Sequence, residues 1–349
     1  MIIFEVSQRY TAVASGALVL GILTLLPVPA LGCASCGCTL SSDAALGYSA
    51  TSGWRLNIEY DYINQNELRS GSGKASPEQV VNNPADPALG GGEIEHTTQN
   101  RYTTVSVTYS PSSNWHFDLR VPYIQRDHST FGQQSMPFTS AESAPDQHSS
   151  AHVAGLGDMK LIASYQGFLP THNLGVQLGL KLPTGSYGSA VLFKEGPGAG
   201  EPLDNSLQAG TGSTDIILGS YYHTAISQDF DAFVTGQVQA AVTHSPKQLG
   251  NDFRPGNQGT VSFGLRYEDN PKVIPGLQVN VYRKAADQGA LADTANTAGT
   301  VVYLSPGLTL RVSTRTHVYG FVQMPVYRNL DGYQLVPQWT ASGGLSVSF

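Results

Sequence analysis

GWRLNIEYDYI, residues 53–63, alternates between apolar and polar side chains. Its apolar residues occupy the even-numbered positions from Trp54 to Tyr62, and its polar residues occupy the odd-numbered positions from Arg55 to Asp61. Because residues two apart on a β-strand share a face, one face of this stretch is apolar and the other is polar. The stretch therefore predicts a strand that separates hydrocarbon from water.

The same alternation recurs along the chain in runs of about ten residues, which are separated by turns or loops. From it we expect strands near residues 53–63, 98–110, 115–127, 155–168, 173–183, 212–224, 230–243, 257–268, 276–285, 299–312, 316–328 and 333–349. These are about twelve strands, each near the length that a tilted strand needs to cross a bilayer. The alternation is less regular in the runs near 212–224 and 316–328.

The connections between these strands alternate between short turns and long loops. The long loops are 64–97, 128–154, 184–211, 244–256 and 286–298. Outer-membrane barrels sort their connections in this way, with the short turns facing the periplasm. A soluble β-sandwich also alternates, but its loops need not sort by length. The terminal aromatic residue, Phe349, resembles the signal by which outer-membrane proteins are recognised for assembly, and it favours the barrel.

We therefore expect an all-β fold, namely an antiparallel transmembrane β-barrel in a bacterial outer membrane. Its short turns should face the periplasm and its long loops the outside.

The first 32 residues have the organisation of an export signal. Arg9 precedes the apolar run 12–26, and two prolines and the small-residue site 30–32 follow it. A retained membrane anchor is the alternative, but the run is shorter than the ~20 residues that a spanning helix needs. We expect a signal peptide at 1–32, a cysteine-containing segment at 33–52 and the barrel at 53–349.

The composition agrees with strands that have one apolar and one polar face. Charged residues make up only 13% of the chain, whereas it holds 17 tyrosines and 38 glycines. A net charge of −7 argues against nucleic acid as a partner, because phosphate binding needs a basic surface. The partners that we expect are outer-membrane lipid, a small-molecule solute and the barrel assembly machinery.

Three cysteines, Cys33, Cys36 and Cys38, would open the mature chain. Their spacing is compatible with a disulfide, with lipidation of Cys33, and with a soft metal that takes a fourth ligand from elsewhere. A disulfide with a leftover thiol is the favoured interpretation. A c-type haem would need histidine after the second cysteine, where Gly37 stands. We expect no cofactor, with a metal at these cysteines as the alternative.

The polar faces carry charges of both signs, which we expect to line a water-accessible lumen and its permeation path. They are Arg55, Glu59, Asp61, Asp118, Arg120, Asp158, Lys160, Lys181, Arg266, Glu268 and Lys284. The alternative is that these charges pair across the lumen and hold the barrel closed, because an unpaired buried charge is costly. The mixture of signs predicts no strong selectivity for anions or cations.

The positions of the histidines and serines in the sequence do not predict a catalytic site. His148 and His152 fall in the long loop 128–154, where we expect them to be solvated rather than metal-bound. We find no serine and histidine on the apolar face that are placed to meet. The chain is therefore not expected to be an enzyme.

Two motifs resemble a known family. Residues 155–161 follow the pattern G-x-G-D-hydrophobic at the start of a strand, and residues 179–185 follow G-hydrophobic-K-hydrophobic-P-T-G at the end of the next one. Together they resemble the outer-membrane transporters named for the MetA pathway of phenol degradation. The resemblance implies a β-barrel through which small, often hydrophobic or aromatic, compounds pass, and it supplies no catalytic residues.

We therefore expect an outer-membrane channel or transporter for small molecules. The alternative is a barrel with a structural, metal or electron-transfer role centred on the cysteine segment.

Overall fold

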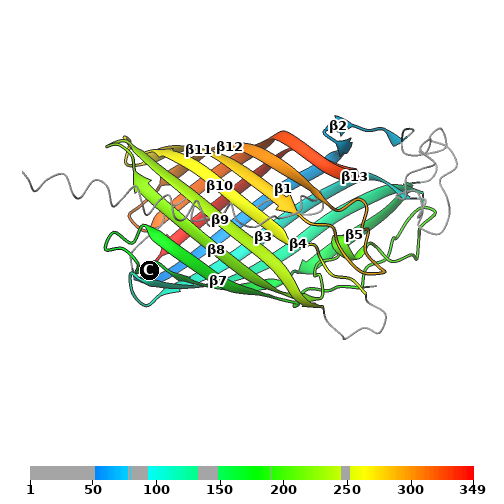
Figure 1. Cartoon of the computed structure of the whole chain (residues 1–349), viewed down its shortest axis with the longest axis horizontal. Helices are drawn as coiled ribbons and strands as arrows, with labels where there is room; N and C mark the ends of the chain where they lie inside the picture. The colour runs from blue at the N-terminus through cyan, green and yellow to red at the C-terminus, as the bar shows by residue number, and fades with distance from the viewer. Residues whose placement is uncertain (1–51, 78, 80–92, 133–147, 189, 245–251) are drawn as a thin grey trace, which may run out of the picture. The chain divides into compact units, whose positions relative to one another are not determined.

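The computed structural model describes residues 52–77, 79, 93–132, 148–188, 190–244 and 252–349. The expected signal peptide and the three cysteines lie outside these residues. The strands (Figure 1) are β1 (Gly53–Gly71), β2 (Gly73–Lys74), β3 (Glu93–Ser110), β4 (Trp115–Gly132), β5 (His148–Leu156), β6 (Met159–Tyr165), β7 (Leu174–Leu182), β8 (Ser213–Ala225), β9 (Phe230–His244), β10 (Gln258–Tyr267), β11 (Val273–Lys284), β12 (Gly299–Arg311) and β13 (Thr316–Ser348). A 3₁₀ turn, η3, spans Asn205–Leu207.

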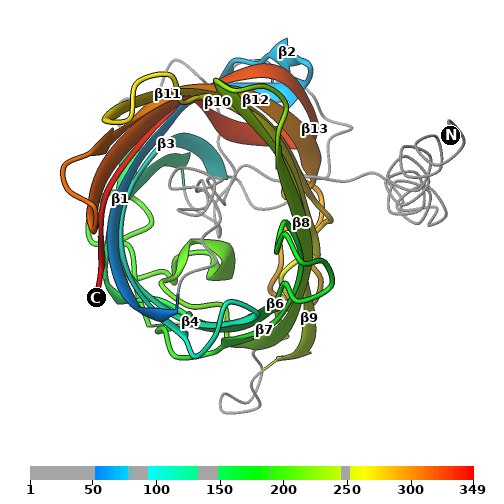
Figure 2. The same cartoon turned by 90° about the vertical axis from the view of Figure 1, so that its left-hand side faces the viewer.

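Eleven of these strands close into one ring. Each pairs antiparallel with its neighbours in the order β13-β12-β11-β10-β9-β8-β7-β6-β4-β3-β1, and β13 pairs with β1 to complete the circle. The end-on view in Figure 2 shows this closed ring. β2 and β5 lie off it, paired with β1 and β4. The ring confirms the predicted antiparallel barrel.

The long strand β13 crosses the barrel twice. Its first arm pairs with β12 as far as Gly299↔Leu330, and its second arm pairs with β1 from Gly71↔Leu330 onward. The chain reverses just after Leu330, where Gly332 takes a φ of 60°, a conformation that favours glycine. Ten single passes and two passes of β13 make twelve crossings, which agrees with the sequence prediction.

Several strands run further into the outer loops than the sequence indicated. β1 continues to Gly71, β4 continues to Gly132, and residues 148–156, which were expected in a loop, form β5 against the upper part of β4. The expectation that His148 and His152 lie in a loop is therefore wrong. Above the bilayer both faces of a strand meet water, so the alternation that reveals the membrane-crossing part disappears there.

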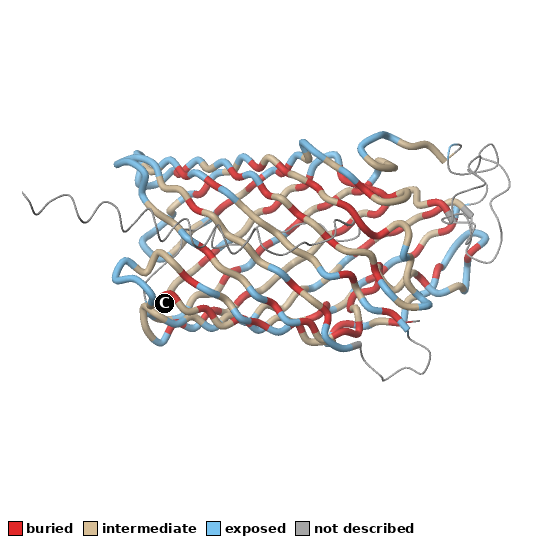
Figure 3. Tube along the Cα trace, in the orientation of Figure 1, coloured by how far each residue is buried: buried red, intermediate tan, exposed pale blue. Residues whose placement is uncertain are grey.

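The distribution of exposed side chains is the reverse of that in a soluble protein. Outward Leu178, Leu218 and Phe263 are 60%, 51% and 50% exposed, whereas inward Asp61 and Asn100 are 1% and 0% exposed. Figure 3 shows this alternation along the strands. A sandwich would bury its apolar face in a core, so these values exclude it and require a lipid-facing band.

Within the described residues, no helix has both the length and the apolar character needed to cross a membrane.

Aromatic rings lie over inward-facing glycines of the neighbouring pass. The four pairs are Tyr221 over Gly175, Phe233 over Gly264, Phe321 over Gly307 and Tyr319 over Gly344. In the first three pairs the two residues are direct cross-strand partners. A Cβ at any of these glycines would overlap the ring. The glycines therefore let large rings lie flat against the wall instead of projecting into the lumen.

We expect Gly264→Ala to destabilise the barrel by about 1–3 kcal/mol, the usual range for overpacking, because the new Cβ would displace the Phe233 ring. The measurement is the midpoint of urea unfolding in detergent micelles. Adding Phe233→Leu should restore most of the loss.

The matched control is Gly236→Ala on β9, where a Cβ would meet no atom within 4 Å. Equal unfolding midpoints for the Gly264→Ala and Gly236→Ala proteins would contradict the role of the covered glycine.

Candidate functional site

The charged residues predicted to line the lumen all share the polar, inward side of the barrel wall. Toward the periplasmic end, Arg55, Asp118 and Arg120 line a cavity of about 30 Å³, together with His116, Gln177 and Tyr221. A space of this size holds about two water molecules. Arg120 Nε donates to Asp118 Oδ2 at 2.5 Å, and Lys160 stands directly across from Arg120 on β6.

Two further predicted carboxylates are bound by hydroxyls of β13. Tyr319 Oη donates to Glu59 Oε2 at 2.6 Å, and Ser342 Oγ donates to Asp61 Oδ1 at 2.5 Å. Both carboxylates lie on β1, so these bonds cross the strands that close the ring. Uncharged hydroxyls thus solvate acidic groups that are more than nine-tenths buried.

The remaining predicted charges form ion pairs at the two ends of the barrel. At the periplasmic end, Glu268 Oε1 lies 2.8 Å from Arg266 Nη2 in an ion pair, and Glu268 Oε2 accepts from Arg311 Nη2 at 2.9 Å. Burial by itself would raise the pKa of the Glu268 carboxyl, but the cations of Arg266 and Arg311 hold that pKa below its usual value. At the other end, Lys284 Nζ lies 2.7 Å from Asp287 Oδ1, and both side chains are buried.

Asp158 and Lys181 meet in a buried cluster. Lys181 Nζ lies 3.0 Å from Asp158 Oδ2 and 3.2 Å from Asp215 Oδ1 on β8, and it also donates to the hydroxyls of Thr211 and Ser213. The three charged side chains are 3–6% exposed. We call Asp158, Lys181 and Asp215 the clamp. A lysine between two carboxylates, with hydroxyls around it, meets the demand that buried charges be paired and hydrogen-bonded.

The clamp holds both ends of the connection between β7 and β8, residues 183–212, which we call the mouth loop. Asp158 Oδ1 accepts from Gly185 N at 3.1 Å, where the loop begins. Asp158 Oδ2 accepts from Thr211 N at 3.0 Å, where the loop ends. The two resemblance motifs thus supply Asp158, Lys181 and Gly185 to one structure, which fixes where the mouth loop leaves and re-enters the wall.

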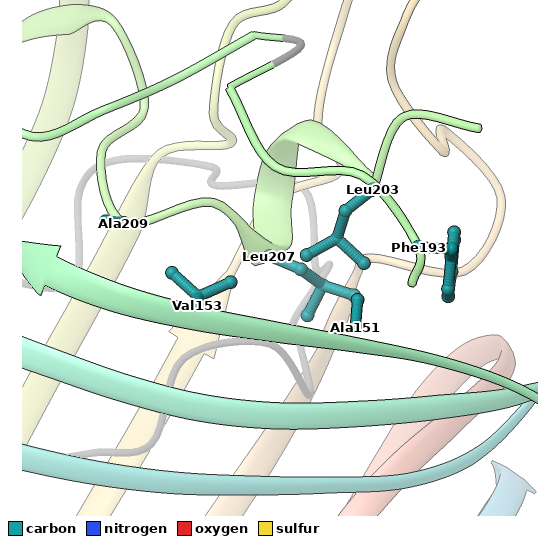
Figure 4. Close-up of a cluster of buried hydrophobic side chains, with 6 residues drawn as sticks. All are labelled: Ala151, Val153, Phe193, Leu203, Leu207 and Ala209. Atoms are coloured by element: carbon teal, nitrogen blue, oxygen red, sulfur yellow. The ribbon is translucent and has the colours of Figure 1, made fainter. Parts of the chain in front are cut away.

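The mouth loop folds against the inner side of the wall. The inward side chain of Arg126 on β4, itself 4% exposed, donates to the carbonyl oxygens of Leu207 and Gln208. Val153 and Ala151 of β5 pack against Leu203, Leu207 and Phe193 of the loop (Figure 4). In Figure 2 the green ribbon that follows β7 projects inside the outline of the ring.

The mouth loop also reaches the opposite side of the barrel. Asn205 Nδ2 donates to the carbonyl oxygen of Leu291, in the connection between β11 and β12, at 3.4 Å. β11 lies six passes from β4 in either direction around the ring, so the two walls face each other. The mouth loop therefore extends across the extracellular opening from β4 and β5 to the loop between β11 and β12 on the opposite side.

Three residues of this arrangement were missed by the sequence analysis. Arg126 shares the polar face of its strand, but nothing in the sequence shows that it meets loop carbonyls. Asp215 lies in the run near 212–224, where the alternation is irregular. Asp287 follows β11 in a loop, where no periodicity applies.

The described residues contain no group of three or more His, Cys, Asp or Glu side chains that could hold a metal ion. The metal alternative rests on Cys33, Cys36 and Cys38, which lie outside those residues, so it stays a prediction. The permeation role of the lumen charges also stays a prediction.

Comparison with solved structures identifies the class of fold. No protein-family model matches the sequence, and no curated protein matches it either. Among solved structures, the COG4313 outer membrane channel from Pseudomonas putida F1 superposes with a TM-score of 0.60 at 10% identity, covering 89% of this chain and 100% of that chain.

Two other barrels are more distant. The transport unit of the autotransporter AIDA-I from Escherichia coli has a TM-score of 0.47 at 10% identity, with 97% of each chain covered. The toluene transporter TodX from P. putida has a TM-score of 0.41 at 10% identity, covering 88% of this chain and 93% of that chain. Both TM-scores are below 0.5, so nothing further is inferred from these two barrels. The likeness to the COG4313 channel shows the fold: this chain is a closed β-barrel of the bacterial outer-membrane type.

Proposed function

We propose that this protein is an outer-membrane channel for small molecules. The observation that carries the proposal is the mouth loop, which is fixed by the clamp and by Arg126 inside a barrel whose inward face is polar and charged. A barrel that served only as a membrane anchor would need neither a loop across its opening nor charged groups along its interior. Asp118 and Arg120 line the cavity toward the periplasmic end of this path.

The mouth loop determines which solutes enter. Because Asn205 reaches the loop between β11 and β12 on the side opposite β4, a solute from outside meets the mouth loop before it meets the interior of the barrel. The loop therefore restricts the channel to small compounds. Hydrophobic or aromatic solutes are the proposed cargo class, which rests on the resemblance of residues 155–161 and 179–185 to the transporter family. We propose outer-membrane lipid and the barrel assembly machinery as the other partners, and no catalytic activity.

We expect Lys181→Met to release the mouth loop. Removing the cation leaves Asp158 and Asp215 as two facing carboxylates with 6% and 3% exposed side chains, and breaking a buried pair in this way typically costs about 3–5 kcal/mol. Asp158→Asn should have a smaller effect, because Lys181 keeps Asp215 as its partner. In planar bilayers, conductance should rise in the order wild type, Asp158→Asn, Lys181→Met.

Trypsin added to intact cells provides a second measurement. Lys194 in the mouth loop should be cut faster in the Lys181→Met protein than in the wild type. Lys272→Met is the matched control, because Lys272 is exposed in the turn after β10, at the other end of the barrel. Heat-dependent mobility on gels checks that each barrel is folded. Unchanged conductance and unchanged cleavage in a folded Lys181→Met barrel would contradict the proposal that the clamp holds the mouth loop in place.

The cargo class has its own test. A strain that lacks this protein should take up a small aromatic solute such as phenol more slowly than its parent at low external concentration. Uptake of a disaccharide should be equal in the two strains, because the mouth loop excludes solutes of that size. Equal phenol uptake in both strains would contradict the aromatic cargo class, and conductance in bilayers would still test the channel itself.

A further inference from the structure

A polar pocket of about 380 Å³ opens on the outer side of the barrel wall, over β3, β4 and β5. We call it the rim pocket, and its charged lining residues are Asp127, His152, Lys194 and Glu195. Asp127 and His152 are direct cross-strand partners. The rim pocket lies on the lipid-facing side of the wall, so the proposed solute path does not use it.

The rim pocket lies just above the apolar band. The outermost exposed large apolar side chains on the outward face of β4 and β5 are Tyr123 and Leu156, which are 42% and 50% exposed. Asp127 and His152 each lie four residues further toward the outside on the same face. With a rise of ~3.3 Å per residue and a strand tilt of ~40°, four residues correspond to about 10 Å along the barrel axis. This is the level of lipid headgroups and of sugars attached to them.

The polar groups of the rim pocket are held in fixed positions. Asp127 Oδ2 accepts from Arg101 Nη1 at 2.8 Å, and Asp127 Oδ1 lies 2.6 Å from His152 Nδ1. One carboxylate therefore orients both a guanidinium and an imidazole on the outward face of the wall. The second nitrogen of the imidazole and the exposed Lys194 side chain remain as polar contacts for a ligand.

Backbone pairing brings the mouth loop over this part of the wall. Lys194 N donates to Ser150 O at 2.8 Å, and Ser150 N donates to Glu195 O at 3.2 Å. The lysine is thereby placed beside the outward face of β5 although it is far from β3 and β4 in the sequence. Thr97, Ser129 and Gln99 also line the pocket and add hydroxyl and amide groups to it.

We propose that the rim pocket binds the phosphorylated sugar headgroup of a glycolipid in the outer leaflet. Cations recognise the phosphate, while hydroxyl, amide and carboxylate groups suit the hydroxyls of the sugar. The acyl chains of the same lipid lie on the apolar outward face below, which carries Tyr123, Leu156 and Leu161. A water-soluble sugar phosphate has no acyl chains and would not contact the apolar part of this surface.

The experiment uses the purified full-length protein in a neutral detergent and fluorescently labelled diphosphoryl lipid A as the probe. The competitors are dephosphorylated lipid A, phosphatidylglycerol and glucosamine phosphate. We expect saturable binding of the probe, which unlabelled lipid A displaces at concentrations about tenfold below those of each competitor, a difference of roughly 1.4 kcal/mol.

The variant Arg101→Gln with Lys194→Gln removes the lining cation Lys194 and the guanidinium bound to Asp127, and it should weaken binding of the probe by about tenfold or more. Its matched control, Lys272→Gln with Arg315→Gln, makes the same change in charge at exposed positions in the periplasmic turns and should bind as the wild type does. If the first variant yields no heat-modifiable barrel, the proposal is tested by probe binding to the single variant Lys194→Gln, which changes an exposed loop position. Displacement by phosphatidylglycerol as readily as by lipid A, or equal binding by both double variants, would overturn the proposal.

Discussion

A strand inside a lipid bilayer cannot leave a backbone N–H or C=O group unpaired, because no water is present to replace the missing partner. The closed ring of this chain follows from that constraint. The seam between β1 and the second arm of β13, from Arg55↔Ser348 to Gly71↔Leu330, removes the last two free edges of the sheet. Closure also determines where side chains lie, since alternate residues must face either lipid or the enclosed space. Most apolar residues of the strands are therefore outside, and the chain has to stabilise an interior that is largely polar.

The interior meets this requirement by pairing its charges locally. Lys181 between Asp158 and Asp215, Lys284 with Asp287, and Glu268 with two arginines are ion pairs within the wall or between the wall and an adjacent loop. The two interpretations of the lumen charges, as a lining and as pairs that stabilise the barrel, are thus compatible for these residues. Where the pairs also hold a loop, as at Asp158, the stability of the wall and the shape of the opening depend on the same side chains.

The sequence predicted the barrel, the twelve crossings and the inward position of the charged residues, because all three depend on a period of two that the bilayer imposes on each strand. Asp61 and Lys181 could be placed on this basis alone. The sequence could not predict β5 or the upper ends of β1 and β4, because above the bilayer neither face must be apolar. Nor could it predict the bond from Arg126 to the carbonyls of Leu207 and Gln208, since a loop conformation leaves no periodic trace. The motif at 155–161 singled out Asp158 in the sequence. Only the structure shows that its carboxylate accepts hydrogen bonds from both ends of the mouth loop.

The rings that cover glycines bear on how the barrel assembles. A strand that slips by one residue exchanges its lipid-facing and interior side chains, which the membrane itself rejects. A slip by two residues preserves that division, so the bilayer cannot detect it. Such a slip between β9 and β10 would set Phe233 against Ser262 or Arg266, where a side chain already fills the space that Gly264 leaves empty. The glycines thus distinguish the correct register from its nearest tolerated neighbour by steric exclusion.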